Sequence, residues 1–254
     1  MLHHMKLQSE PFHKIKNGRK TIELRLNDEK RQQVQVGDFI EFSQMDAPLQ
    51  RLTVRVIALH QFNSFAELYA ALPKEKLGYA SDETPDHDDM HAYYPCDEQK
   101  KYGVLGIELR LTDLQKFVDA QEYGYSFGET YETALSEIKN GEKETHWIWY
   151  VFPQIQGLGF GDISTYFSIK DLEEAKDYYA HPLLGERLVR ISEELLKLRT
   201  DDPMTVFGRT DAFKLRSCMT LFRYAAPEQE VFRKVLDQFC LGAEDDKTVK
   251  RLGL

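Results

Sequence analysis

Three charged residues near the start of the chain, Lys20, Glu23 and Arg25, have types and spacing that suit chemistry on a polar ligand. Apolar and polar residues alternate across 21–26, which predicts a half-buried strand. Because residues two apart on a strand point to the same side, Glu23 and Arg25 share one face, with Lys20 at the strand entrance. A carboxylate beside two cations can act as a general acid or base, and the cations can bind phosphate.

Arg19 and Thr21 flank Lys20 in the sequence and join it as candidate ligand-binding residues. The same pattern also fits a simpler structure, in which the polar residues form a solvated strand face with a local ion pair. Spacing alone leaves both interpretations open.

The stretch resembles the signature of the ASCH family, Gly-x-Lys-x-x-Glu-x-Arg, with matches at Gly18, Lys20, Glu23 and Arg25. Later segments resemble the family's next turn and strand, the strand after it, its helix start and its closing strand: residues 36–42, 52–56, 62–68 and 102–109. The resemblance covers roughly residues 5–111 and implies a PUA-like β-barrel.

Proteins of this family are generally suspected of binding RNA or acting on modified nucleosides, so the resemblance implies RNA or a nucleotide-like small molecule as partner. One branch resembles amidohydrolases that deacetylate N4-acetylcytidine with a lysine-activated threonine and an acid. Lys20 matches that lysine, but Glu23 occupies the position of the nucleophilic threonine, and Thr21 matches a different threonine. Because a carboxylate is a poor substitute for that nucleophile, we expect no deacetylase of this type.

Charge and composition narrow the class of protein. The net charge of −9 over 254 residues argues against coating nucleic acid by bulk electrostatics. Residues 1–35 nevertheless carry eight Lys or Arg against four Asp or Glu, a local balance of +4. A nucleotide or a single strand of RNA could dock on such a face.

The sequence predicts a cytoplasmic protein with no membrane segment. No apolar run approaches the length of a transmembrane helix, and the first residues lack the apolar stretch of a secretory signal. Three widely spaced cysteines, Cys96, Cys218 and Cys240, are typical of reduced cytosolic thiols.

An acidic stretch, residues 81–99, interrupts the first half and has the composition of a loop. His87 and His91 are four residues apart, as metal ligands on one helix face would be, but the sequence fixes no third ligand. We therefore expect no metal and no cofactor, and favour a flexible lid or a surface insertion.

The spacing of apolar residues changes near residues 111–114, where strand alternation gives way to helical periodicity. We therefore expect two domains, residues 1–112 and 113–254, in an α+β chain whose β-barrel is followed by a mostly α-helical domain. Helix starts are predicted at Asp171, Pro182, Asp202–Pro203 and Ala226–Pro227.

Both tryptophans of the chain lie in the stretch 146–159, which combines aromatic residues with a proline and glycines. Core packing explains such a stretch, since aromatic residues supply large buried areas. Polar residues beside the apolar runs also fit the lining of a small-molecule pocket, with His146, Gln154 and Lys214 as candidate ligand-binding residues.

The second half resembles an uncharacterised bacterial family, domain of unknown function 1810. Matching motifs are Phe-Val-Asp-Ala-Gln and Gly-Glu-Lys-Glu-Thr-His-Trp-Ile-Trp, and further matches occur at residues 152–159, 181–188 and 211–222. This resemblance implies an α-helical fold and nothing about chemistry.

Three classes of function remain open at this point. In the first, which we favour, the barrel binds RNA or a modified nucleotide through a Lys20, Glu23 and Arg25 cleft. In the second, Lys20 and Glu23 are a catalytic acid/base pair of a hydrolase or transferase acting on a modified nucleoside or nucleotide metabolite. In the third, the helical half is catalytic and the barrel recognises the substrate.

Overall fold

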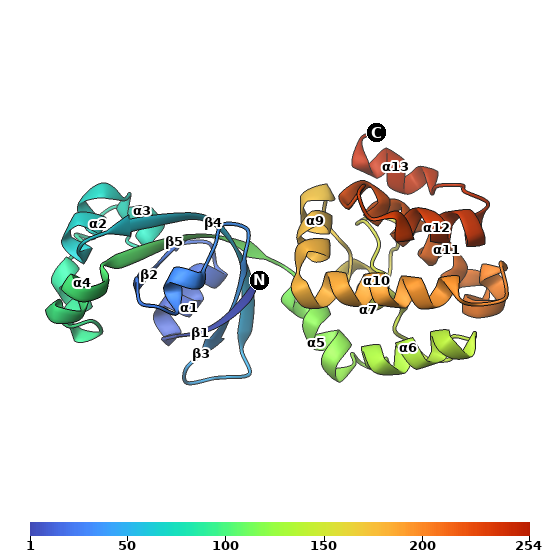
Figure 1. Cartoon of the computed structure of the whole chain (residues 1–254), viewed down its shortest axis with the longest axis horizontal. Coiled ribbons are helices and arrows are strands. Elements are labelled where there is room, and N and C mark those ends of the chain that lie inside the picture. The colour runs from blue at the N-terminus through green and yellow to red at the C-terminus, as the bar shows by residue number, and fades with distance from the viewer. The chain divides into compact units, whose positions relative to one another are not determined.

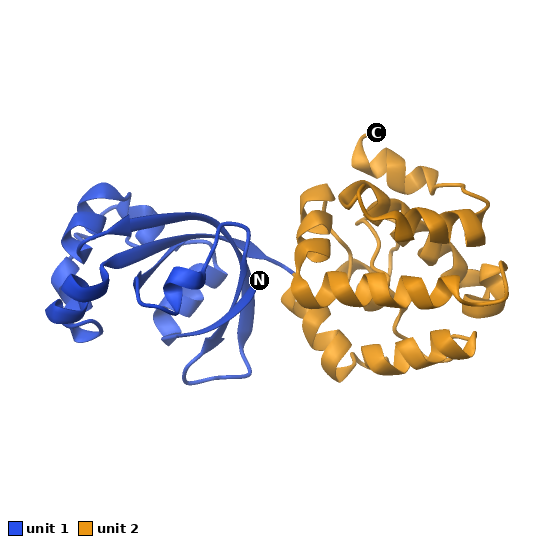
Figure 2. Ribbon diagram, viewed as in Figure 1, with its two compact units in different colours: residues 1–113 blue, residues 114–254 orange.

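The computed structural model describes all residues from Met1 to Leu254 and divides them into two units, Met1–Asp113 and Leu114–Leu254. Figure 1 shows the secondary structure of each unit, and Figure 2 colours the two units separately. Each unit has its own set of buried apolar side chains.

The first unit is built on one mixed five-stranded sheet, with the strand order β1-β3-β4-β5-β2. β1 is parallel to β3, and the other neighbouring strands are antiparallel. The strands are β1 Leu2–Leu7, β2 Ile22–Leu26, β3 Phe39–Gln44, β4 Arg51–Phe62 and β5 Val104–Thr112. Since β1 and β2 lie at opposite edges and do not pair, the curved sheet is a half-barrel with one open side (Figure 1).

Helices fill and cover this half-barrel. α1, Ser9–Lys16, packs Phe12 and Ile15 into a core formed with β1, β3, β4 and β5. A second core joins the apolar residues of β2 to helices α2 and α3 through Phe65, Leu68 and Leu77. The helical segments besides α1 are η1 Arg31–Gln33, α2 Phe65–Ala71, α3 Lys74–Leu77, η2 His87–Ala92 and α4 Cys96–Tyr102.

The second unit is helical, and its long helix α10, Pro182–Leu196, packs against α6, α9 and α12. Its helices are α5 Gln115–Tyr123, α6 Tyr131–Asn140, α7 Ile148–Val151, α8 Asp162–Tyr166, α9 Leu172–Ala180, α10 Pro182–Leu196, α11 Pro203–Ala225, α12 Glu230–Cys240 and α13 Asp246–Leu252. No helix in the chain has both the length and the apolar character needed to cross a membrane.

Capping residues explain where several of these helices begin. The Asp171 carboxylate accepts the backbone N–H of Glu174, and Asp202 accepts that of Met204. The start predicted at Ala226–Pro227 is wrong, because Gln229 caps α12 three residues later through the N–H of Val231. Pro227 instead lies in a turn closed by the Gln229 N–H on the Ala226 carbonyl.

The two units should fold independently when the chain is divided at Asp113. We expect fragments 1–113 and 114–254 each to be soluble and to unfold cooperatively, because each contains its own core. Circular dichroism should give a β-rich spectrum for the first fragment and a helical one for the second. Two unfolded fragments would show that the halves share one folding unit, and would contradict the predicted division at residues 112 and 113.

Candidate functional site

The open side of the half-barrel is bridged by a side chain. Arg25, on β2, donates from Nη2 to the backbone carbonyl of Lys6 on β1, at 2.8 Å. Edge strands present backbone groups that need partners, and a guanidinium can supply several donors at once. Arg25 therefore connects two strands that no ladder joins.

Glu23 lies between two cations at the same place. Its Oε1 is 3.0 Å from Arg25 Nη2, and its Oε2 is 3.1 Å from Lys20 Nζ. Glu23 is only 5% exposed, and the side chains of Lys20 and Arg25 are largely buried as well. The three groups carry a net charge of +1, which leaves positive charge for an anionic ligand.

Burial by itself lowers the pKa of Arg25, but the Glu23 carboxylate and the Tyr94 hydroxyl beside it outweigh that effect and raise the pKa. Arg25 is thus a permanent cation. Oε2 of Glu23 is buried and has the Lys20 ion pair, but no aligned hydrogen-bond donor.

These residues line a pocket of about 400 Å³. Four tyrosines also line the pocket: Tyr69, Tyr79, Tyr93 and Tyr94. Two further cations, Lys6 and Lys14, are among its lining residues. The hydroxyls of Tyr69 and Tyr79 are 3.1 Å apart, and Lys14 Nζ lies 5.7 Å from the centre of the Tyr79 ring. Burial and the Tyr79 hydroxyl raise the pKa of Tyr69, which keeps it a neutral phenol.

The acidic stretch 81–99 forms part of the pocket wall. Met90, Tyr93 and Tyr94 from this stretch line the pocket, and the Tyr94 ring stacks on Phe65 at 5.6 Å. Buried Gln99 anchors the stretch, donating to the Tyr94 carbonyl at 3.0 Å and accepting the Phe65 N–H at 3.4 Å. The stretch therefore supplies part of the pocket wall, and its movement as a lid stays a prediction.

The structure brings together some of the predicted residues of the first unit and not others. Lys20, Glu23 and Arg25 meet in the pocket, whereas Arg19 is exposed and outside it. Thr21 also lies outside the pocket, and its backbone bonds to Lys76 and Leu109. Sequence reasoning missed the tyrosines, although the pair Tyr93–Tyr94 within an acidic stretch was a usable signal.

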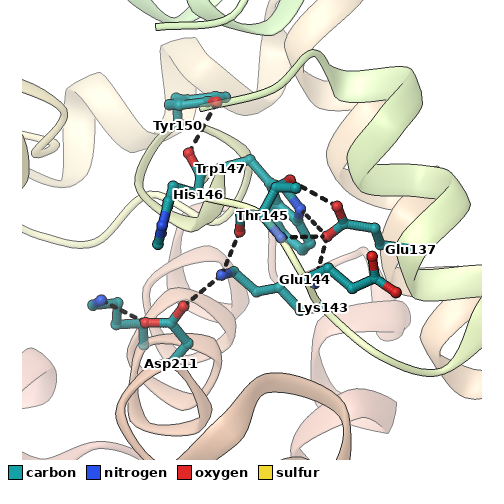
Figure 3. Close-up of polar contacts among 9 residues, drawn as sticks. Glu137, Lys143, Glu144, Thr145, His146, Trp147, Tyr150 and Asp211 are labelled. Carbon is teal, nitrogen blue, oxygen red and sulfur yellow. Dashed lines mark hydrogen bonds and ion pairs between the residues drawn. The ribbon is translucent and has the colours of Figure 1, made fainter. Parts of the chain in front are cut away.

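The three predicted residues of the second unit have separate contacts. Lys214 pairs with Asp211 at 2.6 Å and lies 4.3 Å from the centre of the Trp149 ring. His146 is exposed, and its carbonyl accepts the Tyr150 hydroxyl at 3.2 Å (Figure 3). Gln154 is partly exposed and accepts the Ile169 N–H through its backbone. That they share one pocket stays a prediction.

A carboxylate that sequence reasoning missed organises the segment around His146. Glu137 on α6 accepts hydrogen bonds from the backbone N–H groups of Glu144 and Thr145, the Thr145 hydroxyl and the Trp147 indole, at 2.7–3.2 Å (Figure 3). Lys143 in the same segment pairs with Asp211 of α11 at 2.8 Å. The long motif 141–149 is therefore tied to two helices.

Two family models match the chain. The model described as protein of unknown function, DUF1810, matches residues 111–252, more than half of the sequence. The chain belongs to the DUF1810 family. An ASCH domain model matches residues 5–113, ahead of the DUF1810 unit. The predicted fold class is confirmed, since a PUA-like half-barrel of the ASCH type precedes a helical domain.

Solved structures similar to this DUF1810 protein are themselves described as hypothetical or without a function. A conserved hypothetical protein of Mycobacterium tuberculosis, Rv1873, is 36% identical, with a TM-score of 0.52, covering 56% of this chain and 97% of its own. Hypothetical protein PH0355 is 33% identical (TM-score 0.37; 44% and 99% covered). Protein PF0455 of Pyrococcus furiosus is 36% identical (TM-score 0.34; 44% and 97% covered). No curated protein matches the chain.

Removing the Glu137 side chain should destabilise the DUF1810 unit strongly. Glu137→Ala leaves the indole and two backbone N–H groups without their acceptor, and should cost about 3 kcal/mol of unfolding free energy. Glu137→Gln should cost about 1 kcal/mol, because its single amide oxygen can take the place of Oε2 and keep those three donors, while the charge and the acceptor at Oε1 are lost. Urea unfolding of fragment 114–254 measures both, and equal costs would contradict the assigned role.

The contribution of Glu137 should also depend on pH. Burial alone raises the pKa of Glu137, but its hydrogen bonds outweigh burial and hold the pKa below the usual 4.5. The extra stability is therefore present above about pH 4.5 and is lost as the pH falls through the lower folded pKa. The difference in unfolding free energy between wild type and Glu137→Gln should become smaller in acid. A difference that does not change with pH would contradict this assignment.

Proposed function

We propose that the ASCH pocket binds a nucleotide-like ligand, either a free nucleotide or the last unit of an RNA strand. The observation that carries the proposal is a buried carboxylate, Glu23, held between Lys20 and Arg25 on the wall of a pocket lined with tyrosines. A volume of about 400 Å³ lies within the common range for small-molecule sites, and suits one nucleotide unit.

The chemistry of the pocket matches the parts of a nucleotide. Tyrosine rings offer apolar faces for a base, as aromatic side chains do in proteins that bind single strands. The carboxylate of Glu23 can accept a hydrogen bond from an exocyclic amine, such as that of cytosine. Lys6 and Lys14 lie among the lining residues, where they can meet a phosphate.

Charge supports a contact confined to the pocket. The whole protein carries −9, while the first 35 residues, which supply most of the pocket's cations, carry a balance of +4. A ligand that neutralises many phosphates along a duplex would need a broad basic surface. Binding one or two phosphates requires only the local excess of positive charge.

A second candidate function uses the same residues as catalysts. Lys20 Nζ and Glu23 Oε2 are close enough, at 3.1 Å, to exchange a proton while a bound nucleoside derivative is hydrolysed or its group transferred. In that case Lys20 and Glu23 are the acid/base pair and Arg25 binds the substrate.

Substitutions of the charged residues test the binding proposal. Glu23→Gln keeps the shape and removes the charge, so it should weaken binding of cytidine 5′-monophosphate by about 1–3 kcal/mol. Lys20→Ala should weaken it similarly. Arg19→Ala and Thr21→Ala change neighbours that lie outside the pocket and should leave affinity nearly unchanged. Isothermal titration of the full chain measures all four.

Two outcomes of these titrations, and one of a separate turnover assay, are informative. Wild-type affinity in Glu23→Gln and Lys20→Ala would reduce the cluster to a structural ion pair. Tighter binding of a short single-stranded RNA than of the mononucleotide would identify an RNA terminus as the ligand. Turnover of an N4-acylated cytidine by wild type but not by Lys20→Ala, followed by mass spectrometry, would favour the enzyme.

The tyrosine wall gives a separate prediction. Tyr79→Leu should weaken nucleotide binding by about 1–3 kcal/mol, the usual value of stacking for one base. Tyr79→Phe keeps the ring and loses only the contact with the Tyr69 hydroxyl, so its affinity should stay close to wild type. Equal losses in both variants, measured in the same titration, would show that the hydroxyl and not the ring face contributes.

A further inference from the structure

A thiol, an imidazole and a carboxylate lie in a row on the segment that walls the pocket. Cys96 Sγ is 3.3 Å from Nε2 of His91, and Nδ1 of the same ring is 3.5 Å from Oδ1 of Asp88. A nucleophile, a base and a group that orients the base form the arrangement by which cysteine hydrolases and transferases are recognised, whatever their fold. No part of the proposed nucleotide binding uses these residues.

The two ring nitrogens of His91 have different neighbours, and this favours one direction of proton transfer. An ionised carboxylate can only accept hydrogen bonds, so Asp88, whose Oδ1 lies 3.5 Å from Nδ1, favours the tautomer with the proton on that nitrogen. The lone pair of Nε2 then faces the Cys96 thiol and can take its proton. The carboxylate also stabilises the imidazolium that results.

Cys96 is the exposed thiol of the three in the chain. Cys218 is buried, and burial raises its pKa well above the usual value, while burial raises the pKa of half-buried Cys240 to about 11. Cys96 is the first residue of α4, and Asp97 and Glu98 follow it in the first turn. His91 is the base in contact with this exposed thiol, at 3.3 Å.

The position of the three residues relates them to the pocket. Residues on both sides of His91, namely Asp89, Met90, Tyr93 and Tyr94, line the pocket. Cys96 follows two residues after Tyr94. A ligand seated against these tyrosines would thus be bound by the segment that carries the thiol.

We propose that Cys96, His91 and Asp88 form a nucleophilic triad that takes an acyl group from an ester or activated amide. His91 accepts the thiol proton as Cys96 Sγ forms a bond to the carbonyl carbon. The bond from that carbon to the oxygen or nitrogen of the leaving group then breaks, and the leaving group takes the proton from His91. Water hydrolyses the thioester, releasing the acid and restoring the thiol.

Alkylation of the full-length protein with iodoacetamide near pH 7 tests whether His91 activates the thiol. Labelling should occur at Cys96, and His91→Gln should slow it about tenfold. Asp88→Asn should slow it less, with recovery in Asp88→Glu, because Asp88 positions the ring. His87→Gln is the matched control: His87 also contacts Asp88, at 3.1 Å, but has no contact with the thiol. Its labelling rate should match wild type.

Reaction with p-nitrophenyl acetate tests acyl transfer itself. Intact-mass and peptide analysis should find one acetyl group on Cys96, with a burst of nitrophenol equal to the protein present. Cys96→Ser should remove the burst, and Cys240→Ser should retain it. EDTA in every sample excludes metal-catalysed hydrolysis of the ester.

The triad would be overturned if Cys96 of wild type were alkylated no faster than free glutathione and at the same rate in His91→Gln. It would also be overturned if p-nitrophenyl acetate acetylated lysines and left Cys96 unmodified. The outcome is distinct from that of the proposed nucleotide binding. Cys96→Ser should still bind cytidine 5′-monophosphate, and Lys20→Ala should still be alkylated at Cys96.

Discussion

The ion-pair cluster of Lys20, Glu23 and Arg25 connects the fold of the ASCH unit to its candidate site. Arg25 holds the Glu23 carboxylate and also the Lys6 carbonyl across the unpaired edges of the sheet. Removing one member of a buried pair leaves the other charge uncompensated, which commonly costs several kcal/mol. The same contacts therefore connect the two unpaired edge strands and place a carboxylate and two cations beside the opening.

Part of this arrangement could be predicted from the sequence. Alternation across β2 put Glu23 and Arg25 on one face, and spacing put Lys20 nearby, as the structure has them. Alternation could not show that this face is buried, because the side chains that cover it come from segments much later in the sequence. Tyr69, Tyr79 and Tyr94 reach it only once α2, the segment 74–79 that includes α3, and the stretch 81–99 fold over β2.

The helical half shows a similar limit. Two of its helix starts follow from the local capping residues Asp171 and Asp202, so they could be predicted, whereas the start of α12 at Glu230 could not. The motif around His146 looked like a ligand site because it combines polar and aromatic residues. Several of its polar groups, however, donate hydrogen bonds to Glu137 within the protein. Only the tertiary structure shows which polar groups have partners. Lys214, beside the Trp149 ring, is a partly exposed cation near this motif.

A crystal structure of the full chain soaked with cytidine 5′-monophosphate would show whether the ASCH pocket binds a nucleotide. We predict density for one nucleotide in the pocket beside β1 and β2, with its exocyclic amine on Glu23, its base against the tyrosines and its phosphate near Lys6 or Lys14. A nucleotide bound elsewhere on the protein, with the Lys20, Glu23 and Arg25 cluster untouched, would contradict it.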